Sequence, residues 1–173
     1  FAIDELIDAK QQHILLRAGK RFISYNHEQR SLEPIPNLML SPASSGFRAA
    51  IGKKQIIIIE KPTCHLQCTN TIVHAIDVHN INNREDIFIE HESFRDIVIG
   101  VDLSEIYFVT PDSPIPVRRL NVAARTIEES PMTLRALESN FNYASSDQQL
   151  VTSALAKEFR ARAIMNNTIL VGA

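Results

Sequence analysis

The protein has 173 residues, of which 45% are hydrophobic and 22% are charged, and its formal net charge is -2. This length suits one domain with a real core, and ordinary hydrophobicity with few net charges excludes a disordered chain. A sequence pI near 6.3 argues against nucleic acid as a partner, and no apolar run approaches the roughly 18 residues that span a bilayer, so we expect no membrane segment.

The ends and the cysteine content bear on organisation and location. The sequence begins with Phe1 and shows no signal-peptide pattern, so we expect a single domain over residues 1–173 that is a piece of a longer chain. Its two cysteines are four positions apart and do not make a disulfide framework. We therefore favour a reducing compartment such as the cytoplasm, and we expect no cofactor.

The first third of the chain predicts a helix, a strand and a long loop. Residues 2–20 carry apolar side chains at helical spacing, with Gly19 where a C-cap would lie. Residues 21–26 predict a short strand, and residues 27–52 predict a long loop because they hold several prolines and a Ser-Ser-Gly turn. The apolar positions of the predicted helix are Ile3, Leu6, Ile7 and Ile14.

The middle of the chain predicts strands. The β-branched run at residues 55–60 is typical of a strand buried on both faces. Extended segments are expected to follow it in one central, mostly antiparallel sheet over residues 55–110, with a hairpin connection at residues 79–85. The expected segments are residues 69–78, 86–91, 97–101 and 105–110.

The last third of the chain predicts helices. Prolines interrupt the pattern, and helical spacing then recurs up to a closing strand at residues 168–171. With an N-terminal helix and C-terminal helices packed on the sheet, the predicted fold class is α+β. No internal repeat is evident. The expected C-terminal helices are residues 117–129, 131–140 and 146–166.

A cluster of thiols and imidazoles is the sequence feature most suggestive of chemistry. Both cysteines and four of the six histidines lie between positions 64 and 91. Zinc accepts such ligands, so a metal site is one open alternative. If residues 71–79 form a strand, however, His74 and His79 point to opposite faces and could not share an ion. The cluster consists of Cys64, His65, Cys68, His74, His79 and His91.

A cysteine nucleophile with a histidine base is a second alternative. An imidazole within hydrogen-bond reach activates a thiol and can later protonate a leaving group. A hairpin centred near Asn80 would set His91 opposite position 69, beside Cys68, whereas a centre two residues later would set it opposite Val73. The sequence leaves the register open.

The run Leu66-Gln67-Cys68-Thr69-Asn70-Thr71-Ile72-Val73, followed by Ile87-Phe88-Ile89-Glu90-His91, resembles the core of the cysteine deamidases typified by cytotoxic necrotizing factor and the chemotaxis deamidase CheD. The resemblance implies hydrolysis of a glutamine side-chain amide on a protein substrate. It also implies that Cys68 is the nucleophile and His91 the base, with His79 as a fallback base. A papain-like order, with Asp96 or Asp102 as an orienting acid, is a further alternative.

Two interpretations need no catalysis. Free cysteines are often buried, so Cys64 and Cys68 would then simply fill a core. The chain would be a non-enzymatic protein-interaction domain, with the loop at residues 27–52 or the arginine-bearing helices as its contact surface. Those arginines would alternatively bind an anion. They are Arg118, Arg119, Arg125 and Arg135.

Overall fold

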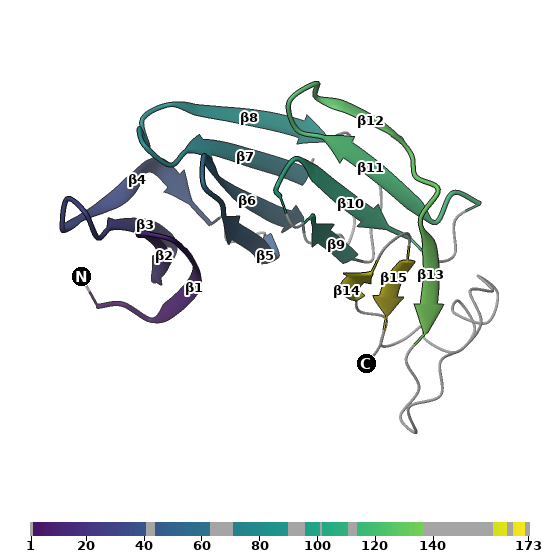
Figure 1. The fold of residues 1–173 in the computed structure, drawn as a ribbon, viewed down its shortest axis with the longest axis horizontal. Helices are drawn as coiled ribbons and strands as arrows, with labels where there is room; N and C mark the ends of the chain where they lie inside the picture. The colour runs from purple at the N-terminus through teal and green to yellow at the C-terminus, as the bar shows by residue number, and fades with distance from the viewer. Residues whose placement is uncertain are drawn as a thin grey trace. The chain divides into compact units, whose positions relative to one another are not determined.

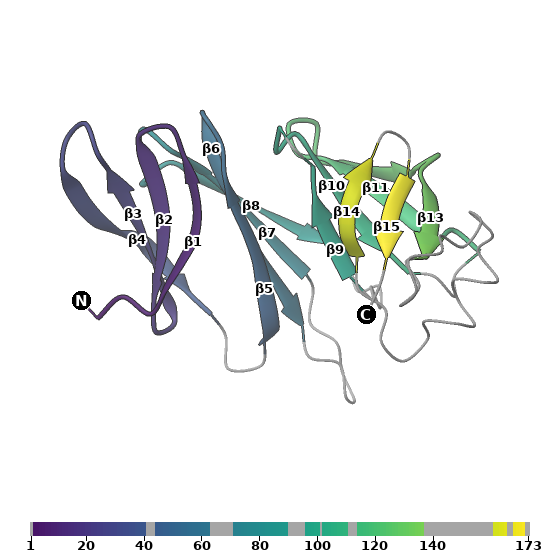
Figure 2. The ribbon, with the colours of Figure 1, turned by 60° about the horizontal axis from the view of Figure 1, so that its bottom comes forward.

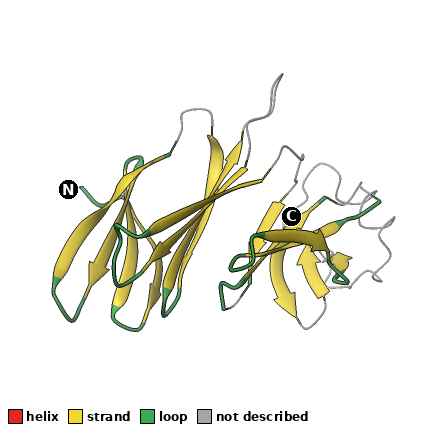
Figure 3. Ribbon diagram, turned by 90° about the horizontal axis from the view of Figure 1, so that it is seen from above, coloured by secondary structure: helices red, strands yellow, loops and turns green. Residues whose placement is uncertain are grey.

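The computed structural model describes most of the chain, and all regular structure in that part is β (Figure 3). No helix occurs among the described residues, so the predicted α+β class is wrong. The same residues therefore include no helix long and apolar enough to cross a membrane. The described ranges are residues 2–40, 44–62, 71–89, 96–100, 102–110, 114–136, 161–165 and 168–171.

The chain divides into two compact units, Phe1–Glu92 and Ser93–Ala173. The first unit contains two four-stranded antiparallel sheets in which consecutive strands are neighbours, β1-β2-β3-β4 and β5-β6-β7-β8 (Figure 1). That the whole chain is one domain stays a prediction. The strands are β1 (Glu5–Lys10), β2 (His13–Ala18), β3 (Arg21–Asn26), β4 (Ser31–Met39), β5 (Ser44–Ile51), β6 (Gln55–Pro62), β7 (Thr71–Asp77) and β8 (Arg84–Ile89).

The predicted N-terminal helix is a β-hairpin, β1-β2 (Figure 2). The chain reverses at Gln11, which has a φ of 53°, and again at Gly19, which has a φ of 60°. A helix C-cap and a tight β-turn both need a residue at positive φ, so Gly19 was a correct turn signal assigned to the wrong element. The apparent apolar stripe is not a buried one, because Leu6 is 60% exposed while Leu15 is fully buried.

The predicted loop at residues 27–52 contains two whole strands, β4 and β5. Prolines at positions 34 and 36 suggested a loop because proline cannot donate to a β-ladder. They are tolerated because β4 is the last strand of its sheet, where one side of the backbone need not pair. Pro34 keeps its place in the register, opposite Ile23 of β3.

The strand predictions within the first unit are largely confirmed. β3 has the predicted bounds, and Ile56–Ile59 of β6 are fully buried on both faces of the strand. β7 and β8 form the expected antiparallel hairpin. The predicted single sheet over residues 55–110 is wrong, because β6, β7 and β8 belong to one sheet and the strands after residue 95 belong to another.

The two sheets of the first unit pack face to face around an apolar core. Their first strands are in contact, and the Ile51 amide at the end of β5 donates to Asp8 Oδ2 of β1 at 2.9 Å. Burial of this set supplies the main stabilisation of the unit. The core residues are Leu15, Phe22, Ile35, Leu38, Ile51, Ile56, Ile58, Ile76 and Val78.

The second unit holds another four-stranded antiparallel sheet, β9-β10-β11-β12, and a three-stranded sheet of order β13-β15-β14. In the latter, β13 and β15 run parallel to each other. The strands are β9 (Asp96–Ile99), β10 (Glu105–Val109), β11 (Val117–Asn121), β12 (Thr126–Glu129), β13 (Thr133–Ala136), β14 (Ala161–Met165) and β15 (Thr168–Val171).

The predicted C-terminal helices are therefore corrected where they are described. Residues 117–129 form the β11-β12 hairpin, and its turn holds Arg125 at a φ of 57°. Residues 133–136 and 161–165 are strands, and residues 131–132 have no regular structure. The remaining residues of these two predicted helices, 137–140, 146–160 and 166, lie outside the described residues. The closing strand at residues 168–171 is confirmed.

One structural unit recurs although no repeat is evident in the sequence. Among the described residues, a four-stranded antiparallel meander occurs three times, beginning at β1, at β5 and at β9. Repetition at the level of strands needs only alternating burial and turns at similar intervals, which many different residues supply.

Candidate functional site

The predicted catalytic pair lies outside the described residues. Cys68 falls in the range 63–70 and His91 in the range 90–95, and the same holds for Cys64 and His65. In the described hairpin Thr71 pairs with Ile89, so the register is centred on Asn80. That is the register on which the nucleophile hypothesis depended, and the pair itself stays a prediction.

The other two histidines of the cluster lie in different surroundings. His74 is buried within β7, and His79 is exposed in the loop between β7 and β8. No group of three or more His, Cys, Asp or Glu side chains in the described part of the chain is arranged to hold a metal ion. A zinc site that includes the two cysteines would involve residues outside that part.

His74 is enclosed by charged side chains from both neighbouring strands. Its Nδ1 atom lies 2.7 Å from Asp86 Oδ1, directly across the β7-β8 ladder, and its Nε2 atom lies 3.9 Å from Glu60 Oε2. Arg84 Nε contacts the same Asp86 oxygen at 3.2 Å, and Arg84 Nη1 donates to the carbonyl of Pro36 at 2.8 Å. The cluster therefore links the two sheets of the unit.

Burial limits what this cluster does chemically. The His74 side chain is 7% exposed, and Nε2 is buried without a hydrogen-bond partner among the described residues. The arrangement suits a structural contact inside the fold, since a substrate needs access that the ring lacks.

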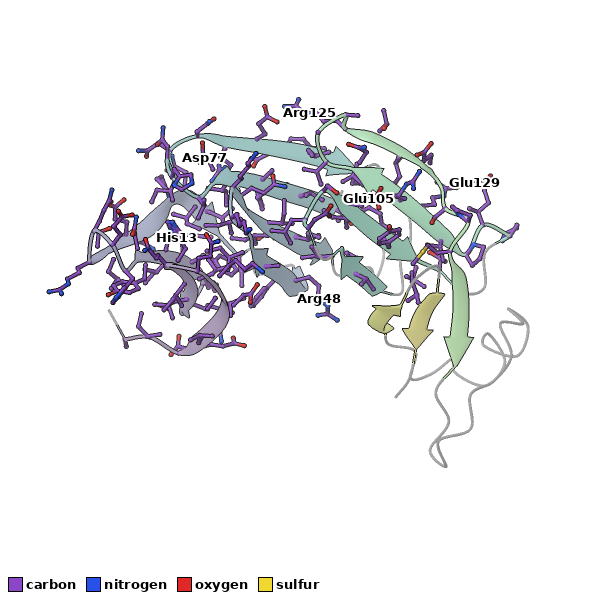
Figure 4. The ribbon with its side chains drawn as sticks, viewed as in Figure 1. His13, Arg48, Asp77, Glu105, Arg125 and Glu129 are labelled. Carbon is purple, nitrogen blue, oxygen red and sulfur yellow. The ribbon has the colours of Figure 1, made fainter. Side chains whose placement is uncertain are left out.

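Two histidine side chains are in contact where β2 begins, at His13. The rings of His13 and His79 meet edge to face, with centroids 5.5 Å apart. His13 is labelled in Figure 4. Burial lowers the pKa of His13 below 6.5, and the neighbouring His79 lowers it further, while Glu28 opposes the shift. His13 Nδ1 is buried and has no hydrogen-bond partner within the described ranges. The fold thus favours a neutral His13.

A polar pocket of about 140 Å³ lies between the first sheet and the β7-β8 loop. Along β3, the residues on the face toward the core change from Phe22 to Ser24 to Asn26, so this face turns polar near its end. Ser24 pairs with Glu33, and Asn26 with Ser31, across the β3-β4 ladder. The lining residues are Ser24, Asn26, Gln29, Ser31, Glu33, Val78, His79, Asn80, Ile81 and Asn82.

Both rims of this pocket are held by side chain to backbone hydrogen bonds. Asn26 Oδ1 accepts from the amides of Glu28 and Gln29, at 3.0 and 3.2 Å. On the opposite rim, Asp77 Oδ1 accepts from the His79 amide at 2.8 Å. Such Asx turns fix loop backbones. The pocket is therefore pre-formed, apart from any ligand.

An exposed aromatic side chain marks the outer strand of the second sheet. Phe88 is 62% exposed on β8, between the buried Ile87 and Ile89, and β8 is the last strand of its sheet among the described residues. Large exposed aromatic residues are enriched where proteins bind one another. Sequence reasoning missed Phe88, because a strand pattern does not say which face will remain uncovered.

One of the arginines proposed as an anion site, Arg119, forms ion pairs within the second unit. Arg119 forms ion pairs with Glu128 and Glu105, so its guanidinium already has two carboxylate partners. Asp102, proposed as an orienting acid, accepts from the Ser104 hydroxyl and amide, which lowers the pKa of this exposed carboxyl. Arg135 has no described side-chain position.

No protein-family model matches this sequence. No curated protein matches it significantly either.

Proposed function

We propose that this chain is a repeat scaffold built from blades of the β-propeller type, and that it binds another protein without catalysing a reaction. β-Propellers repeat a four-stranded antiparallel sheet radially, and a single such sheet cannot bury its own apolar faces. The observation that carries the proposal is the tandem meander of the first unit, in which the first strands β1 and β5 contact each other. The contact surface proposed here differs from the two that the sequence suggested, residues 27–52 and the arginine-bearing segments, which form strands where they are described.

The partner we propose is an extended segment that pairs with β8. A terminal strand has unpaired backbone groups, and strand addition uses them for affinity while side-chain contacts supply specificity. Phe88 is the side chain on this strand best able to anchor an apolar residue of the partner, because most of its ring is in solvent.

A site-specific photocrosslinker tests this proposal. It replaces Phe88 in one form of the protein and Ile127 in a control form, since Ile127 is also exposed on a terminal strand, β12. Cross-linking in the source cells, followed by mass spectrometry, identifies the partner segment. We expect Phe88→Ser to weaken binding of that purified segment at least tenfold and Ile127→Ser to leave it unchanged. Equal cross-linking at both positions, or unchanged binding by Phe88→Ser, would overturn the proposal.

A second candidate function is cysteine-dependent deamidation, favoured by the Thr71–Ile89 register described above. In this proposal Cys68 Sγ attacks the carbonyl carbon of a substrate glutamine and His91 transfers the thiol proton to the leaving nitrogen. Ammonia departs, and water then hydrolyses the thioester to a glutamate side chain and restores the thiol.

Alkylation of each cysteine as a function of pH, in the presence of a chelator, tests the deamidase proposal. A thiolate at Cys68 that persists well below pH 8.5 and is lost in His91→Ala would support it. Cys64 serves as the internal control, because it has no role in the proposed step. A Cys68 that reacts only after unfolding would remove the deamidase proposal and leave the scaffold proposal intact.

A further inference from the structure

The pocket between the first sheet and the β7-β8 loop has the composition of a binding site for a small polar molecule. Eight of its ten lining residues are polar, and only Val78 and Ile81 are apolar. Ser24, at 6% exposure, and Val78, at 4%, lie deepest. A ligand that enters must replace the hydrogen bonds that water makes to hydroxyl, carboxamide and imidazole groups.

Charge narrows the class of ligand. Glu33 is the one carboxylate in the described lining, and no lysine or arginine lines the pocket. An anion would be repelled by Glu33 and would find no cation to bind. A cation would have a single, exposed carboxylate to compensate for its lost hydration. A neutral ligand avoids both penalties.

Size narrows it further. A cavity of about 150 Å³ accommodates one benzene ring, so a pocket of about 140 Å³ has room for one six-membered ring. The lining requires many hydrogen-bonding groups on that ring. Carboxamides and hydroxyls both donate and accept, which is the pairing that the hydroxyl groups of a polyol need.

The pocket is also organised in advance. Asn26 and Asn80 use their Oδ1 atoms to fix the rims, and each also carries an Nδ2 donor. Binding therefore does not have to order these two loops, and less of the interaction energy is lost as conformational entropy.

We propose that this pocket binds one neutral, hydroxyl-rich ring of monosaccharide size, a ligand site separate from the β8 surface. The ring would lie between the Ser24 side of the first sheet and the β7-β8 loop, with its less polar face toward Val78 and Ile81. This ring belongs either to a free sugar or to the terminal sugar of a glycan, because both present the same hydroxyl pattern.

NMR titration of the uniformly ¹⁵N-labelled protein tests this inference. The probes are glucose, galactose, mannose, N-acetylglucosamine and myo-inositol, together with the methyl glycosides of the sugars, each at millimolar concentration. We expect saturable shift changes at the amides of Asn26, Asn80 and Asn82 with at least one probe. Binding of methyl glycosides alone would indicate a glycan end, and binding of free sugar as well would indicate a free ligand.

Variants separate this site from non-specific contact. Ser24→Ala and Asn82→Ala each remove one polar lining group, and we expect each to weaken binding several-fold. Asn82→Ala keeps the loop intact, since the turn bond runs from the Asn82 backbone amide to Asn80 Oδ1. Ser104→Ala, in the second unit, is the matched control. No saturable shift with any probe, or equal affinity in all variants, would overturn the inference.

Discussion

Each unit holds a side-chain contact to a carboxylate, and these two contacts lie in different surroundings. In the first unit, His74 is 7% exposed and Asp86 29% exposed, and their contact lies against the inter-sheet core. In the second unit, Arg119 is 30% exposed and its partner Glu128 is 58% exposed, on the outer hairpin β11-β12. A contact to a carboxylate therefore lies beside an apolar core in the first unit and largely in solvent in the second.

The difference shows when such contacts affect stability. Loss of one partner inside a fold leaves the other desolvated and unpaired, whereas an exposed group returns to water at little cost. We therefore expect the His74–Asp86 contact of the first unit to contribute more to stability than the Arg119–Glu128 pair of the second unit.

Asp86→Ala should have the largest effect. It removes the acceptor of His74 Nδ1 and the ion-pair partner of Arg84, so we expect the free energy of unfolding to fall by about 1–3 kcal/mol. Urea unfolding at pH 7 measures this loss. Glu85→Ala, at an exposed position of the same strand, is the control, and an equal loss in both variants would contradict the assignment.

His13→Gln should reduce the pH dependence of stability. Because the folded pKa of His13 is lowered below 6.5, this histidine contributes stability above that pH and loses it as the pH falls toward the folded pKa. Unfolding midpoints measured from pH 7.5 down to pH 5 should decline less in His13→Gln than in the parent protein. Identical declines would show that His13 titrates normally.

Glu105→Gln should lower the pKa of Tyr107 from about 12 toward 10. Burial raises this pKa first, and Glu105 adds to the shift by accepting the phenol proton in a hydrogen bond and by its charge. The substitution removes only the charge-dependent part, so a partial shift is expected in an ultraviolet titration. A value that stays near 12 would assign the whole effect to burial.

Glu128→Ala should have the smallest effect of the four. It breaks an ion pair whose carboxylate is mostly in solvent, and we expect a loss below about 1 kcal/mol that disappears in high salt. Thermal or urea unfolding at low and high salt measures it. A loss as large as that of Asp86→Ala would remove the contrast between the units.

The sequence predicted strands where the local signal was strong. The β-branched residues Ile56–Ile59 were correctly assigned as a strand buried on both faces, and the β3 bounds were correct. The helix predictions failed because apolar residues at helical spacing also fit a hairpin whose turn interrupts the alternation, as at Gln11. Strand pairing decides between a helix and a hairpin, and a short stretch of sequence does not show which strands pair.

The pocket could be predicted only in part. Phe22, Ser24 and Asn26 occupy alternate positions of β3 and so share one face, and the change from apolar to polar along that face was visible in the sequence. That the β7-β8 loop would cover this polar end depends on how two sheets pack, and no local pattern encodes it. The Cys68–His91 pair depends on residues outside the described ranges.

The two prolines of β4 also bear on self-assembly. Pro36 directs its carbonyl to Arg84 of β8, and neither it nor Pro34 has an amide hydrogen to offer an incoming strand. A second copy of the chain that pairs with β4 would therefore lack two hydrogen-bond donors, which disfavours cross-β assembly along this strand. We therefore expect fibre formation in concentrated solution to become faster when both prolines are replaced with valine, which has an amide hydrogen.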